Sequence, residues 1–163
     1  VPGLAEEMQT WLEDGGVAPL SEAEMEALRI EKGRPVFGKD MNEDTIPVEA
    51  GIHGRAIDNN KGCYTGQEVI IRIRDRGQVN KELRGILLGD APVPASGEEL
   101  FLPGNEKSVG WVTSATESPA FGQAIALGYL RRAVAPGADV CVGGPHGPTG
   151  QVRALSDDGW IRD

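Results

Sequence analysis

The pattern of hydrophobic and polar positions changes near residue 80. Before that point, apolar residues recur every three or four positions in two stretches, which is typical of amphipathic helices. After it, short apolar runs alternate with turns rich in glycine and proline, which is typical of an all-β region. The change predicts an α+β portion over residues 1–80 and a separate domain over residues 81–163.

Two short helices are predicted in the N-terminal portion. The first covers residues 5–12 and is expected to place Trp11 in the core. The second begins after Ser21, which opens a capping box, and ends near Leu28. The alternation over residues 29–33 is predicted to be the end of a strand.

Two segments between these helices and the all-β region have less regular patterns. Residues 33–47 are rich in turn formers and acids, and they are predicted to form a surface loop. Residues 69–76 leave two alternatives open. Their β-branched side chains favour a strand, whereas a helix would place Val69, Ile70 and Ile73 on one face.

Six short runs rich in β-branched and other apolar residues follow residue 80, each bounded by turn residues. Six strands of this length suit a small antiparallel β-barrel. Trp111 and Cys141 lie within two of the runs, and both are expected to be buried, with Cys141 chemically inert. The runs cover residues 83–88, 99–102, 108–114, 123–130, 139–142 and 150–155.

The net charge, the apolar runs and the cysteines argue against several classes of protein. The net charge of −9 argues against a general nucleic-acid binder, which needs many Lys and Arg contacts to phosphates. No run of eighteen apolar residues is present, so no membrane-spanning helix is predicted, and the chain does not begin with a signal-peptide pattern. The two cysteines lie far apart and outside any metal-ligand spacing, which predicts a cytoplasmic protein without a metal site.

The segment Lys-Gly-Cys-Tyr-Thr-Gly-Gln-Glu, residues 61–68, holds the most distinctive candidate chemistry. Cys63 stands after a predicted turn, where its sulfur would be accessible. Lys61 would favour the reactive thiolate through its charge, and so would a helix that begins at Gly66. Cys63 is therefore the candidate nucleophile or redox group.

Two other residues of this octet are candidates as well. Tyr64 could stack on a flat ring, and Gln67 could form hydrogen bonds that hold the loop.

Three further segments outside the octet have distinctive patterns. The segment Arg29-Ile30-Glu31-Lys32-Gly33 has the pattern R-x-E-x-G, while residues 47–51 read Pro-Val-Glu-Ala-Gly and residues 112–114 read Val-Thr-Ser.

The octet resembles the signature of the YgfZ family, folate-binding proteins that are similar to the glycine-cleavage T-protein and are implicated in assembly or repair of iron–sulfur enzymes. The other three elements resemble T-protein segments. The resemblance runs from about Leu28 to the end of the chain. It implies the C-terminal part of a T-protein-like folate-binding domain followed by a small antiparallel β-barrel, with the N-terminal half of that fold as a partner. It also implies a short helix that begins at Gly66.

The resemblance further implies tetrahydrofolate as the cofactor. In such proteins the glutamate of R-x-E-x-G faces the pterin ring, and a carboxylate suits this position because it can accept two N–H donors in one planar arrangement. By this resemblance Glu31 is the principal candidate for binding folate. Arg29, Lys61, Tyr64 and Gln67 are the other candidates.

The function predicted from these features is support of iron–sulfur cluster assembly or repair, with iron–sulfur client proteins as partners. Cys63 would take up a one-carbon unit, relay a thiol exchange or contact a cluster transiently, and the sequence does not choose among the three. The alternative is a tetrahydrofolate-dependent aminomethyltransferase of the glycine cleavage system, whose relatives use an aspartate from the N-terminal half. A third hypothesis is a binding module without chemistry.

Overall fold

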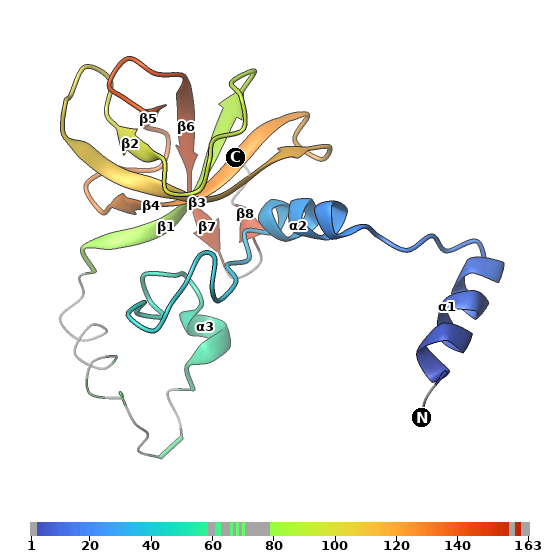
Figure 1. The fold of residues 1–163 in the computed structure, drawn as a ribbon. Helices are drawn as coiled ribbons and strands as arrows, with labels where there is room; N and C mark the ends of the chain where they lie inside the picture. Colours follow the sequence, from blue (N-terminus) through green and yellow to red (C-terminus); the bar gives the residue numbers. More distant parts are fainter. Residues whose placement is uncertain are drawn as a thin grey trace.

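The computed structural model describes residues 3–58, 61, 62, 66, 68, 70, 79–156, 159 and 160. In these residues a β-barrel lies beside the helices and loops that precede it in the chain (Figure 1). The helices are α1 (Leu4–Asp14), α2 (Glu22–Glu31) and α3 (His53–Ala56); the strands are β1 (Lys81–Gly89), β2 (Glu99–Phe101), β3 (Ser108–Ser118), β4 (Gln123–Arg131), β5 (Asp139–Val142), β6 (Thr149–Arg153), β7 (Leu155–Ser156) and β8 (Gly159–Trp160).

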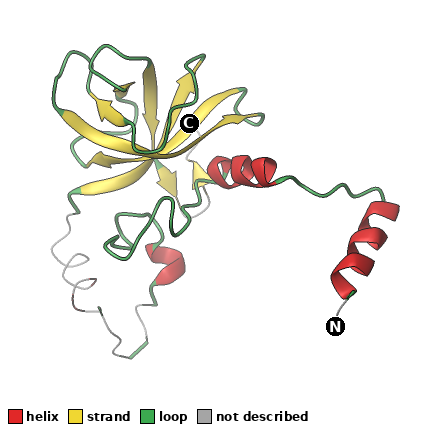
Figure 2. Cartoon of the chain, in the orientation of Figure 1, coloured by secondary structure: helices red, strands yellow, loops and turns green. Residues whose placement is uncertain are grey.

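Strands β1 to β6 close into a barrel in the order β1-β4-β3-β2-β5-β6, and neighbouring strands pair antiparallel (Figure 2). This confirms the six predicted strands and the predicted fold class. Strands β7 and β8, which were not predicted, form a separate two-stranded ribbon. The ribbon lies beside β1 and the C-terminal end of α2 (Figure 1).

Strand β4 is buried on both of its faces, because successive side chains of a strand point to opposite sides. Ala126 and Leu130 belong to the cluster that fills the barrel. Ile125, Leu127 and Tyr129 belong to a second cluster, which Ile30 of α2 joins. The outer face of β4 is therefore the surface on which the helical portion packs.

Helix α2 is longer than predicted. Its capping box is present, with Ser21 Oγ accepting a hydrogen bond from Glu24 N at 3.2 Å. The predicted end at Leu28 and the predicted strand end over residues 29–33 are wrong. The helix continues because Ile30 is fully buried against the barrel, a contact between distant segments that local spacing does not reveal.

Two tryptophans were predicted to be core residues, and both predictions are wrong. Trp11 is 74% exposed, because α1 extends away from the barrel and has no buried residue among those described. Trp111 is 39% exposed, because it lies on the outer face of β3. The prediction for Cys141 is confirmed with respect to burial, since this residue is 3% exposed. In the part of the chain that the structure describes, no helix is long and apolar enough to cross a membrane.

Candidate functional site

The candidate site is the seam where α2 and the segment after it lie against β3. Arg29 joins the two sides of this seam. Its NH1 donates to Asp40 Oδ2 at 2.7 Å and to Arg34 O at 2.8 Å, and its NH2 donates to Ser114 Oγ at 2.8 Å. Both Nε and NH2 also donate to the carboxylate of Glu26. All five N–H donors of the guanidinium thus have protein acceptors.

Asp40 is the buried acceptor at the centre of this seam, with 3% of its surface exposed. Besides Arg29, it accepts from Thr113 Oγ1 at 2.5 Å, from Ser114 Oγ at 2.7 Å and from Val36 N at 3.0 Å. Sequence reasoning missed Asp40, because it lies within the predicted surface loop. The predicted loop is present, since no helix or strand covers residues 33–47 and most of them are exposed, but backbone hydrogen bonds from Asp40 N and Met41 N to Val36 O fold it so that Asp40 is buried.

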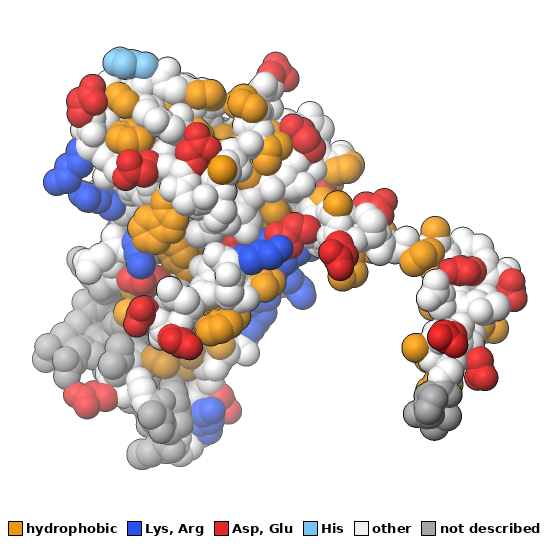
Figure 3. Space-filling model, viewed as in Figure 1, with side chains coloured by type: hydrophobic (Ala, Val, Ile, Leu, Met, Phe, Trp, Pro, Cys, Tyr) orange, Lys and Arg blue, Asp and Glu red, His pale blue; other side chains and the backbone are white. Residues whose placement is uncertain are grey.

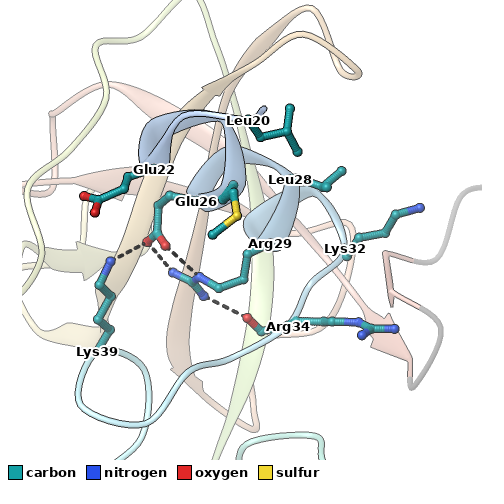
Figure 4. Close-up of a pocket in the computed structure, with 9 residues that line it drawn as sticks. Leu20, Glu22, Glu26, Leu28, Arg29, Lys32, Arg34 and Lys39 are labelled. Atoms are coloured by element: carbon teal, nitrogen blue, oxygen red, sulfur yellow. Dashed lines mark hydrogen bonds and ion pairs between the residues drawn. The ribbon is translucent and has the colours of Figure 1, made fainter. Parts of the chain in front are cut away.

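A cavity of about 760 Å³ lies beside α2 and has Arg29 on its wall (Figure 4). Glu26 accepts hydrogen bonds from Arg29 there and pairs with Lys39 Nζ at 3.1 Å. The hydrogen bond from Arg29 lowers the pKa of Glu26 to about 2, and Lys39 contributes in the same direction. Leu20, Met25 and Leu28 form the apolar part of the lining.

Glu31, the candidate for contact with the pterin, lies at the C-terminal end of α2. Its Oε1 accepts a hydrogen bond from Ser118 Oγ, at the end of β3, at 2.5 Å and one from Ala120 N, in the turn between β3 and β4, at 3.1 Å. These contacts anchor the end of the helix to the barrel. They also hold the carboxylate in one orientation.

A second polar cluster lies further along the seam, around Lys81. Lys81 Nζ is 3.7 Å from Oε2 of the buried Glu49, which belongs to the Pro-Val-Glu-Ala-Gly turn. The same ammonium lies 5.0 Å from the ring centroid of Trp111 and 5.2 Å from that of Tyr129. Burial raises the pKa of the Tyr129 hydroxyl, and the carboxylates of Asp40 and Glu49 raise it further, so the phenol stays protonated at neutral pH.

Arg29 and Glu31 both lie at the seam, where they contact different residues of the barrel, whereas only part of the octet is described. Lys61 is exposed, and Cys63, Tyr64 and Gln67 lie outside the described residues, as does most of the segment over residues 69–76. The roles of the octet residues therefore stay predictions, and so do the proposed folate contacts of Arg29 and Glu31. Among the described residues no group of three His, Cys, Asp or Glu side chains could hold a metal ion.

Comparison with known proteins defines the class of this fold. Residues 81–153 match the family model of the glycine cleavage T-protein C-terminal barrel domain. A crystal structure of glycine cleavage system aminomethyltransferase T from Bartonella henselae superposes with a TM-score of 0.78, covering 98% of this chain and 45% of that chain at 22% identity. The chain therefore has a T-protein-like fold that ends in a closed six-stranded barrel.

Curated relatives with a higher identity than this structure are named aminomethyltransferase. The aminomethyltransferase of Listeria welshimeri is 33% identical over 120 residues, which are 74% of this chain and 32% of the relative. The aminomethyltransferase of Staphylococcus carnosus is 34% identical over 122 residues, which are 74% of this chain and 33% of the relative. The chain spans about a third of the length of these relatives.

Proposed function

We propose that this chain forms the C-terminal part of a tetrahydrofolate-binding protein, and that the whole protein transfers aminomethyl groups. One observation carries the proposal. The likeness to aminomethyltransferases extends over more residues than the segment 81–163 contains, so it includes part of the helical portion as well as the barrel. The hydrogen bonds of Arg29 with Ser114, and of Asp40 with Thr113 and Ser114, join these two portions.

The proposal also requires an N-terminal half that completes the ligand pocket. The described chain leaves apolar surface for such a partner on α1, where acidic and hydrophobic side chains are exposed together (Figure 3). The apolar lining of the cavity beside α2 is exposed as well. Exposed apolar patches of this kind mark protein contacts.

Glu31 is the residue through which we expect this protein to bind tetrahydrofolate, and Glu31→Gln tests that role. The substitution should weaken tetrahydrofolate binding by the full-length protein about tenfold, because an amide offers one acceptor where the carboxylate offers two. Isothermal titration calorimetry would measure the dissociation constant.

Ser118→Ala is the matched control, since it removes the hydrogen bond to Glu31 but leaves the carboxylate in place. It should weaken binding much less than Glu31→Gln does. Equal losses in the two variants would mean that Glu31 acts only as an anchor, which would contradict its proposed contact with folate.

The second candidate function, support of iron–sulfur enzymes, is favoured by the octet, which contains Cys63. Aminomethyl transfer on lipoate needs no protein thiol, whereas thiol exchange or transient cluster contact requires one. The two candidates share tetrahydrofolate and differ in their need for this sulfur.

Cys63→Ser separates the two candidates. For an aminomethyltransferase, we expect glycine-cleavage activity of the full-length protein to stay within about twofold of the wild type, because serine preserves the size of the side chain. Cys141→Ala controls for general effects of removing a thiol. Normal glycine cleavage by the Cys63→Ser protein would contradict the second candidate function. If neither the wild type nor Cys63→Ser cleaved glycine, and Cys63→Ser lowered iron–sulfur enzyme activity in cells, the second candidate function would replace the first.

A further inference from the structure

A groove of about 410 Å³ crosses the outer face of the barrel at the starts of β1, β2 and β3 and the end of β4. Glu99 pairs across the strands with Trp111, and Trp111 pairs with Tyr129. Residues opposite each other in antiparallel strands project to the same side. The three side chains therefore form a row, with the two rings as its floor and the acid at one end.

The floor of this groove is a rigid aromatic surface. The rings of Trp111 and Tyr129 lie 5.5 Å apart between centroids at an angle of 33°. Part of the Trp111 indole is exposed, because this residue lies on the outer face of β3, and the indole lines the groove. A flat ring could pack against this exposed part.

The hydroxyl of Tyr129 is buried beneath this floor, where Asp40, Glu49 and Thr45 act on it. This hydroxyl therefore belongs to the packed interior, and only the ring of Tyr129 contributes to the floor of the groove.

The charges of the residues that line the groove indicate which kind of ligand it could bind. Lys81 and Arg131 line the groove opposite a single acid, Glu99, so the lining carries a net charge of +1 in a chain whose net charge is −9. Arg131 is exposed and forms no ion pair with any described residue, and the ammonium of Lys81 pairs with one described acid, Glu49, at 3.7 Å. Glu99 would repel an anion from one end and so direct it towards the two cations.

We propose that this groove binds an aromatic carboxylate, whose ring packs on Trp111 and whose carboxylate contacts Lys81 and Arg131. The proposal is independent of the proposed aminomethyl transfer, because none of the groove residues is assigned to that reaction. Lys81 lies over both rings of the floor, so one ammonium can contact the carboxylate while the ring of the ligand rests beside it.

Three small probes test the proposal on the full chain. Benzoate carries both ring and charge, benzamide carries only the ring, and acetate carries only the charge. With tryptophan labelled by ¹⁵N, benzoate should shift the indole N–H signal of Trp111 and leave that of the exposed Trp11 unchanged. Its dissociation constant should be lower than those of benzamide and acetate by about tenfold, the effect of one charge-assisted hydrogen bond.

Variants assign the binding to the groove. Arg131→Gln changes an exposed residue and should weaken benzoate binding several-fold without affecting the fold, whereas Lys32→Gln, a cation outside the groove, should have no effect. A Trp111 signal that does not move, equal affinity for benzoate and benzamide, or equal losses in Arg131→Gln and Lys32→Gln would each overturn the proposal.

Discussion

Replacing Asp40 by asparagine is expected to lower the free energy of unfolding by about 3 kcal/mol, because the buried carboxylate compensates the charge of Arg29. Both of its oxygens accept hydrogen bonds, Oδ1 from Thr113 and Ser114 and Oδ2 from Arg29 and Val36. An asparagine offers one oxygen and one amide, so the amide would face two donors at a site without water access.

The loss would be measured as the shift of the urea unfolding midpoint at constant slope. Asp44→Asn is the matched control, because it makes the same chemical change in the same loop at an exposed position. We expect Asp44→Asn to change stability by no more than about 0.5 kcal/mol. A similar loss in both variants would show that Asp40 does not hold the loop on the barrel.

The sequence predicted the barrel well because the signals for its strands are local. Each strand is a short run of apolar residues between turn formers, and such runs need no knowledge of distant partners. Asp40 is the opposite case. Its burial depends on Thr113 and Ser114, which lie 73 and 74 residues away in the sequence, and an acid among turn formers otherwise indicates an exposed loop.

The candidate site was predicted only in part for the same reason. The pattern R-x-E-x-G singled out Arg29 and Glu31, and the structure places both at the seam. Their hydrogen bonds to Ser114 and Ser118 could not be predicted, because they depend on how α2 docks on β3. The tryptophans show this limit of sequence-based prediction most directly. The same side chain is exposed at Trp11 and packed on Phe121 at Trp160, depending on whether another element covers it.

The largest packing effect is expected for Trp160→Ala, which should lower the free energy of unfolding by about 3 kcal/mol. Trp160 lies in the β7-β8 ribbon, packs on Phe121 with ring centroids 5.0 Å apart and donates from Nε1 to Ile30 O at 2.8 Å. Its ring also covers Gly85, where a Cβ would lie within 2.8 Å of ring atoms. The ribbon thereby fastens the end of α2 to the barrel.

Trp11→Ala is the matched control for this experiment, because it removes the same side chain from a residue that is largely exposed. It should leave the thermal unfolding midpoint of the chain unchanged, whereas Trp160→Ala should lower it by at least several degrees. If both variants unfolded at the temperature of the wild type, the ribbon would contribute nothing to holding α2. The orientation of Glu31, one residue beyond the carbonyl that Trp160 contacts, would then have to depend on Ser118 and Ala120 alone.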